Sequence, residues 1–233
     1  MACYSESNLA KYKVDLSEKS NGRTNKRYNP DGKITKITVH HMAGVMRATY
    51  CAEMHRDNGK KQSANYYIGV AGEIAEGVPE SRRAWTSGSA TNDYQAITIE
   101  VSNSEASDPW PVSEKSWASL VDLCIDICKR NGIQKLTYTG NSSGNLTIHK
   151  MFQKTICPGP YLEDRMDELA DMVNENLMCL NEDTNAALFY EVKRGDTLTK
   201  ICLMYDTTIA QLVRLNNIKN INRIYVGQRL RVR

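Results

Sequence analysis

Two short segments rich in β-branched residues constrain the fold of this chain more than any other feature. Residues 33–41 (KITKITVHH) and 95–103 (QAITIEVSN) both predict buried strands, because Val, Ile and Thr favour extended backbone. Residues 64–78 (ANYYIGVAGEIAEGV) predict two further strands, joined as a hairpin around Ala71 and Gly72. With 233 residues, the chain is long enough for one sizeable core and a small additional module.

Amphipathic segments that predict helices lie between and after these strands. Residues 48–58 predict a short helix, and residues 113–131 a longer one, with Ser113 as its N-cap and Gly132 as its C-terminal stop. From Pro160 onward, apolar residues recur at helical spacing and predict a helix of about five turns. Because strands and helices alternate irregularly, we predict an α/β fold with a central mixed β-sheet flanked by helices.

A polar segment divides the chain into two parts of different charge. Residues 181–188 (NEDTNAAL) show no periodicity, so we expect a linker at residues 180–188, between domains at residues 1–179 and 189–233. The second domain contains nine Lys and Arg against three Asp and Glu, whereas the rest of the chain contains 21 against 24. This asymmetry indicates a separate module attracted to an anionic surface, although the sign of the charge alone fits nucleic acid equally well.

The cysteine pattern argues against a disulfide framework. Seven cysteines are an odd number at irregular spacing, so we expect reduced thiols, Cys3 and Cys179 among them. Cys124 and Cys128 have the spacing of a metal pair. They share a helical stripe with Trp117, however, which favours core packing.

The four histidines offer a more specific signal. His40 and His41 end a predicted strand, and His149 stands eight positions before Cys157 in the segment HKMFQKTICPGP. Two imidazoles and a thiolate fill three of the four tetrahedral positions that zinc prefers and leave one for water. The Pro-Gly-Pro turn starts a helix, and a helix N-terminus lowers a thiol pKa. The spacing alone still allows Cys157 to be a nucleophile or a core residue, and His149 a hydrogen-bonded loop residue.

Five ordered blocks resemble the zinc-dependent N-acetylmuramoyl-L-alanine amidases of the type 2 family. This family is related to peptidoglycan recognition proteins and occurs in many phage endolysins. The resemblance covers roughly residues 30–175 and implies a mixed sheet packed by helices, with a zinc-bearing groove across its face. The blocks are TVHHMAG, SANYYIGVAGEIAEGVPE, RAWTSG, ITIEVSN and HKMFQKTICPGPYL.

The resemblance implies a ligand set for Zn²⁺. His40, His149 and Cys157 match the three family ligands, and the choice of His40 over His41 rests on the resemblance alone. His55 matches no ligand, and its surroundings (MHRDNG) predict a solvated helix end.

The resemblance also implies catalytic roles. Glu100 matches a carboxylate beside the metal-bound water and would act as general base, although a strand-edge glutamate facing solvent is the simpler alternative. Thr155 matches a polar or cationic position two residues before the third ligand, and Lys154 is the alternative oxyanion partner. The implied reaction is attack by water on the amide that links the lactyl group of N-acetylmuramic acid to L-alanine.

The final 45 residues resemble a LysM domain through YEVKRGDTL, TTIAQLVRLNNI and IYVGQRLRV. Their pattern predicts a small βααβ module. The resemblance implies a groove for N-acetylglucosamine between two loops. Two of its residues, Asp196 and Thr197, are equally good helix caps. The implied groove residues are Gly195, Asp196, Thr197, Leu198, Ile224 and Tyr225.

These resemblances imply a bacteriolytic hydrolase, an endolysin or autolysin, that degrades cell-wall peptidoglycan. The expected partners are the stem peptide and the N-acetylglucosamine-containing glycan of bacterial peptidoglycan, and not nucleic acid. Residues 1–20 contain no apolar signal-peptide core and we find no transmembrane segment, so we expect synthesis in the cytoplasm and action at the wall after release. A non-catalytic peptidoglycan-binding receptor and a cytosolic wall-recycling amidase remain as alternatives.

Overall fold

The chain forms two compact units, Met1–Leu177 and Met178–Arg233. The computed structural model describes residues 4–20, 32–185 and 188–232, without the side chains of residues 179–185. Cys3 and Cys179, expected as thiols, lie outside the described side chains. Among the helices described, none combines the length and apolar composition that a bilayer-spanning segment needs.

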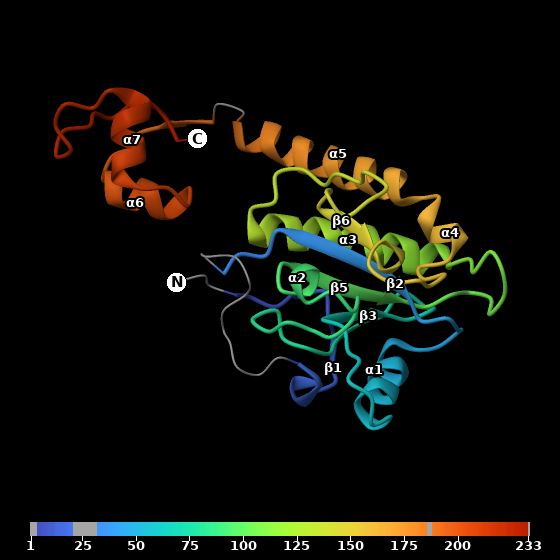
Figure 1. The fold of residues 1–233 in the computed structure, drawn as a ribbon. Helices are drawn as coiled ribbons and strands as arrows, with labels where there is room; N and C mark the ends of the chain where they lie inside the picture. The colour runs from blue at the N-terminus through green and yellow to red at the C-terminus, as the bar shows by residue number, and fades with distance from the viewer. Residues whose placement is uncertain (1–3, 21–31, 186–187, 233) are drawn as a thin grey trace. The chain divides into compact units, whose positions relative to one another are not determined.

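A six-stranded mixed sheet forms the centre of the first unit (Figure 1). Its strand order is β1-β4-β3-β5-β2-β6. The hairpin pair β3–β4 is antiparallel, and the other four neighbouring pairs are parallel. The predicted mixed sheet and the hairpin are therefore confirmed. The strands are β1 (Tyr12–Lys13), β2 (Lys36–His41), β3 (Tyr66–Ile68), β4 (Ile74–Glu76), β5 (Ala96–Val101) and β6 (Leu146–Ile148).

Strand alternation gives the two faces of this sheet different chemistry. Successive side chains of a strand point to opposite faces of the sheet. The apolar residues of β2 and β5 therefore lie on the face that packs against the helical core, and the polar residues lie on the opposite face. The apolar set contains Ile37, Val39, Ile97, Ile99 and Val101. The polar set contains Thr38, His40, Thr98 and Glu100, all buried.

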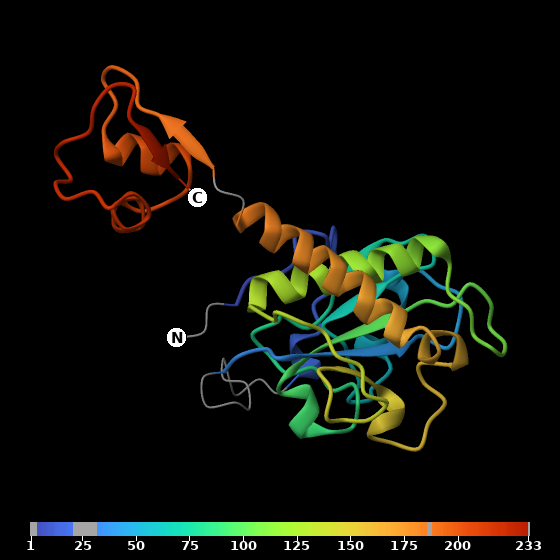
Figure 2. The ribbon, with the colours of Figure 1, turned by 90° about the horizontal axis from the view of Figure 1, so that it is seen from above.

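Helices cover both faces of the sheet (Figures 1 and 2). On the apolar face lie α3 (Glu114–Asn131) and α5 (Met166–Asn185), which supply nearly half of the buried residues of the larger core. On the opposite face α1 (Ala48–Asp57) packs against β3 and β4 in a second, smaller core around Tyr67. The shorter segments are α2 (Ala90–Asp93), α4 (Pro160–Glu163) and two 3-10 turns, η1 (Ser17–Lys19) and η2 (His149–Met151).

The ends of α3 follow the predicted signals. The Ser113 hydroxyl accepts a hydrogen bond from Ser116 N, and Gly132 adopts φ 67° just after the last turn. Cys124 and Cys128 are buried in the core, as expected. All five cysteines whose side chains the structure describes are free thiols.

The prediction of one continuous helix from Pro160 is wrong. The chain forms α4, turns at residues 164–165, where Arg165 N donates to Leu162 O, and restarts as α5. Helix α5 continues to Asn185, so much of the segment expected as an irregular linker is helical. That segment contains neither Pro nor Gly, which would have ended the helix. The domain boundaries themselves stay a prediction.

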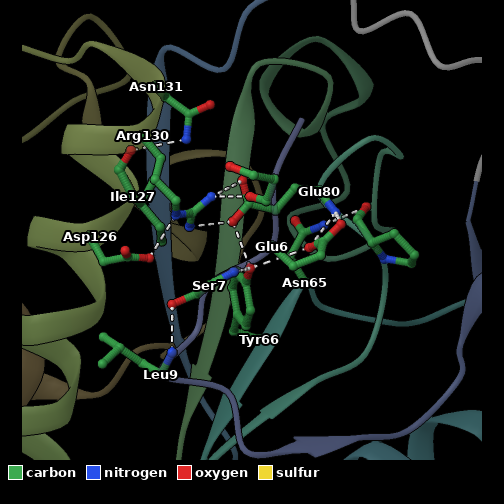
Figure 3. Close-up of polar contacts among 12 residues, drawn as sticks. Glu6, Ser7, Leu9, Asn65, Tyr66, Glu80, Asp126, Ile127, Arg130 and Asn131 are labelled. Carbon is green, nitrogen blue, oxygen red and sulfur yellow. Dashed lines mark hydrogen bonds and ion pairs between the residues drawn. The ribbon is translucent and has the colours of Figure 1, made fainter. Parts of the chain in front are cut away.

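A buried ionic network ties the N-terminal segment to α3 and β3 (Figure 3). Arg130 donates to both oxygens of Glu80, at 2.7 and 3.0 Å, and the Tyr66 hydroxyl donates to the same carboxylate at 2.6 Å. Ser7 N donates to the Tyr66 oxygen at 2.9 Å, and the Glu6 carboxylate accepts from Glu80 N at 3.1 Å. Because the Glu80 side chain is fully buried, its charge depends on these partners.

The second unit has the predicted βααβ order. Strands β7 (Phe189–Glu191) and β8 (Arg229–Arg231) pair antiparallel, and α6 (Leu198–Met204) and α7 (Ile209–Asn216) lie between them in the chain. The unit has a core of its own, which contains Val192, Leu198, Ile201, Cys202, Leu212, Leu230 and Val232.

Candidate metal centre

The parallel register of β2 and β5 places His40 beside Glu100. Paired residues of neighbouring parallel strands point to the same face, so both side chains lie on the polar face of the sheet. Their exposures are 1% for His40 and 8% for Glu100. A histidine and a carboxylate are thus held together in a largely dry environment, near the carboxyl ends of their strands.

The loop that follows β6 brings His149 close to Cys157. Lys150 N donates to Cys157 O at 3.1 Å, which closes residues 149–157 into a compact loop. Gly159 then turns the chain with φ 88°, and a Cβ at this position would lie 2.9 Å from Trp110 Cβ. The turn behind Cys157 therefore requires glycine, because no other residue fits against Trp110.

Three metal-binding side chains converge where this loop meets β2. One ligand atom from each of His40, His149 and Cys157 lies within 4.8 Å of the others, and Cys157 Sγ is 3.6 Å from His40 Nδ1. Ordinary zinc–nitrogen and zinc–sulfur bonds at a tetrahedral angle separate the two donors by about 3.6 Å. The donor set and its spacing therefore fit zinc.

Burial keeps these groups neutral in the protein alone. It lowers the pKa of His40 well below its ordinary value, helped by the neighbouring His149, and raises the pKa of Glu100 to about 8. The pKa of Cys157 is raised well above its usual value by burial and then by the nearby Glu100. A divalent cation would reverse this balance and favour the thiolate, as metal binding requires.

The other two histidines lie outside the donor set. His41 donates through its backbone N to Cys157 Sγ at 3.4 Å, while its ring meets Trp110 edge-on at 5.2 Å. The residues around His55 form an exposed helix end, as expected, but His55 itself is half-buried. Its Nδ1 is 2.9 Å from the Tyr67 hydroxyl, and burial lowers the pKa of His55 to about 4, because α1 packs this residue onto the sheet.

The predicted oxyanion partner has a structural contact. The Thr155 hydroxyl oxygen accepts a hydrogen bond from Cys157 N at 3.2 Å, which leaves the hydroxyl hydrogen free to donate elsewhere. Lys154 is exposed. The role of Thr155 stays a prediction.

Sequence reasoning missed two residues of this region, Gln153 and Trp110. Gln153 Oε1 lies 3.2 Å from His149 Nε2, and Trp110 packs against His41 and Gly159. Both residues belong to irregular segments. The spacing of Gln153, four positions after His149, was the only available signal.

In the second unit, three of the predicted glycan-binding residues have structural roles. The Thr197 hydroxyl caps α6 by accepting from Lys200 N at 3.2 Å. Asp196 accepts from Lys193 N at 2.8 Å and from the Tyr190 hydroxyl at 2.6 Å. Leu198 is 3% exposed and packs in the core, so only its backbone can meet a ligand.

The two loops of the predicted groove start from adjacent points of the small sheet. Val192 lies just before the loop that contains Gly195, and Gly227 lies just after Tyr225 in the other loop. Gly227 N donates to Val192 O at 2.8 Å, which joins these two points. Gly195 and Tyr225 are exposed, and Ile224 is half-buried. Glycan binding by these residues stays a prediction.

Two sequence profiles match the chain. The profile of the N-acetylmuramoyl-L-alanine amidase family matches residues 30–160, and that of the LysM domain matches residues 190–233. The N-acetylmuramoyl-L-alanine amidase XlyB of Bacillus subtilis (strain 168) is 25% identical over 203 residues, which are 82% of this chain and 60% of that protein. An endolysin of Bacillus phage B103 is 51% identical over 49 residues, 21% of this chain and 19% of the endolysin. The chain therefore spans at most about three fifths of these relatives.

Solved structures resemble the fold at low sequence identity. A structure of PlyL, 18% identical, has a TM-score of 0.52, with 70% of this chain and 95% of that chain covered. Staphylococcus aureus hydrolase AmiA in complex with its ligand, also 18% identical, has a TM-score of 0.57, with 73% and 84% covered. At this identity the likeness concerns the fold alone.

Proposed function

The chain belongs to the N-acetylmuramoyl-L-alanine amidase family, and from this premise we propose that it is a zinc-dependent peptidoglycan hydrolase. The bond cleaved is the amide between N-acetylmuramic acid and the L-alanine of the stem peptide. One observation carries the proposal: His40, His149 and Cys157 meet with their ligand atoms within 4.8 Å of one another, on the sheet face that also holds Glu100.

We assign the zinc ligands to His40, His149 and Cys157. When bound, zinc would act as a Lewis acid that polarises the scissile carbonyl and lowers the pKa of a water molecule. Two neutral imidazoles and one thiolate leave a net positive charge at such a centre. The loop closure at Lys150 N and the turn at Gly159 hold Cys157 against β2, which supports this ligand set.

Glu100 is assigned as the general base. Its carboxylate accepts the proton of the attacking water and returns it to the departing L-alanine amine. Burial raises the pKa of Glu100, which suits a group that must both take and release a proton near neutrality. We assign Thr155 to the tetrahedral oxyanion, because its hydroxyl oxygen is already fixed by Cys157 N and its hydrogen can donate.

The LysM module, residues 189–233, is assigned to retention on the wall. Its loops around Gly195 and Tyr225 would bind N-acetylglucosamine, and the excess of Lys and Arg would favour an anionic surface. Tethering a weak binder to the catalytic domain, residues 1–179, raises the local concentration of enzyme on an insoluble substrate. The proposed site of action is therefore the bacterial cell wall.

Digestion of purified peptidoglycan tests the function. The zinc-loaded protein should release new L-alanine amino groups and no new reducing sugars. Removal of zinc with a chelator should stop the release, and added zinc should restore it. New reducing sugars would indicate a glycosidase, and tight binding without any release would indicate the receptor alternative.

A further inference from the structure

Gln153 contacts one of the proposed metal ligands from outside the donor set. Its side-chain oxygen, Oε1, lies 3.2 Å from His149 Nε2. A carbonyl oxygen can only accept a hydrogen bond, so His149 must donate from Nε2. In a neutral imidazole the lone pair is then on the other ring nitrogen, Nδ1.

A metal binds the nitrogen that carries the lone pair, and the hydrogen bond of the second nitrogen decides which one that is. We propose that Gln153 is a positioning residue that fixes His149 in the tautomer presenting Nδ1 to zinc. This inference rests on the zinc site proposed above. His149 needs such a partner more than His40 does, since His40 is held inside a strand and His149 lies half-exposed at the start of the short turn η2.

The structure holds Gln153 itself from two sides. Gln153 N donates to His149 O at 3.3 Å, so both residues belong to one tight turn. On the other side the amide lies over Gly88, which has φ 74°, in the loop before α2. A Cβ on Gly88 would lie 1.8 Å from Gln153 Nε2, so the glycine makes the space that the amide occupies.

Zinc affinity of the full-length protein tests the proposal. Competition with a chromophoric chelator should give zinc binding about 10- to 100-fold weaker for Gln153→Ala than for the unchanged protein. Gln153→Glu offers only acceptor oxygens, so it should restore binding to within a few-fold. The matched control is Gln134→Ala, which removes an exposed glutamine whose side chain donates to Gly132 O.

Gly88→Ala provides a second variant. Its methyl group should displace the flexible amide of Gln153 and weaken zinc binding as much as Gln153→Ala does. The double variant, with both substitutions, should bind zinc no more weakly than either single variant. Unfolding of each metal-free variant, followed by circular dichroism, checks that the fold is intact. Equal zinc affinity of Gln153→Ala and Gln134→Ala would overturn the proposal, as would a Gln153→Glu variant as weak as Gln153→Ala.

Long-range ¹H–¹⁵N correlation spectra of the metal-free protein report the tautomer directly. His149 should carry its proton on Nε2 in the unchanged protein and lose this preference in Gln153→Ala. If the unchanged protein bound no zinc, the proposed function would fail. The spectra would still decide the role of Gln153, because they need no metal.

Discussion

At the scale of single residues, the buried carboxylate of Glu100 links protonation to stability. Burial raises its pKa from the ordinary 4.5 to about 8 in the metal-free protein. Between these two pH values the folded state keeps the proton and the unfolded state releases it. The contribution of Glu100 to the stability of the metal-free protein should therefore fall as pH rises from about 4.5 to 8 and then level off.

Glu100→Gln should remove this pH dependence. Urea unfolding with a chelator present should find the variant more stable than the unchanged protein at pH 8, by on the order of 3 kcal/mol, and similar at pH 4.5. Glu53→Gln, which removes an exposed carboxylate from α1, serves as the control. Parallel pH profiles for Glu100→Gln and the unchanged protein would contradict the expectation.

Cys157→Ser should abolish tight zinc binding and amidase activity together. A hydroxyl is a far poorer zinc ligand than a thiolate, so the loss should exceed the roughly 100-fold that removal of an orienting partner costs. Isothermal titration with zinc and release of L-alanine amines measure the two effects. Cys202→Ala removes a buried thiol from the second unit and should change neither. Zinc affinity retained in Cys157→Ser would rule out the thiolate as a ligand.

Some residues of this region are predictable from the sequence and others are not. His40, His149 and Cys157 carry distinctive chemistry in a recognisable order, so the amino-acid sequence alone suffices to propose them. Strand alternation cannot choose between His40 and His41, because that choice depends on which face α3 and α5 cover. The contact of His55 with Tyr67 could not be predicted, because the local sequence of α1 does not reveal which residue of β3 lies beneath it.

At the scale of elements, local signals predicted where strands and helices lie but not how they pair. β-Branched residues marked β2 and β5, and Ser113 and Gly132 marked the ends of α3. The parallel pairing of β2 with both β5 and β6 joins segments far apart in the chain. Nothing in any one of these segments encodes that pairing. The short edge strand β1 was missed, since two exposed residues carry no periodicity.

The network around Glu80 belongs to this scale because it joins α3, β3 and the N-terminal segment. Arg130→Ala would remove an ion pair from the buried Glu80 carboxylate, and should lower the free energy of unfolding by about 3–5 kcal/mol. Chemical denaturation measures the loss. Arg56→Ala, which breaks a fully exposed pair with Asp57, should cause no measurable change. Equal stability of the two variants would show that the Glu80 network contributes nothing.

At the scale of the whole molecule, each unit has its own core, so the two proposed activities should be separable. A chain ending at Asn185 should still free L-alanine amino groups in a small soluble muropeptide at an unchanged rate. Its retention on purified walls should weaken by at least about tenfold, because the tethered binder is gone. Sedimentation with walls and turnover of the soluble substrate measure the two properties.

An equal loss of both properties would contradict this division. Tyr225→Ala is the matched variant, because it keeps the whole module and changes one exposed residue of the proposed groove. Weaker retention with unchanged turnover in that variant would locate wall binding in the loop before β8. Unchanged retention would exclude Tyr225 from the glycan site.

The N-terminal segment, residues 4–20, also bears on how the first unit is produced as an isolated fragment. The family match begins at residue 30, yet Val14 and Leu16 lie in the smaller core and β1 covers the edge of β4. A recombinant fragment that begins at residue 30 but keeps α5 would expose β4, and an uncovered strand edge pairs readily with other chains. Such a fragment should be poorly soluble during expression, whereas one that retains residues 4–20 keeps its edge protected.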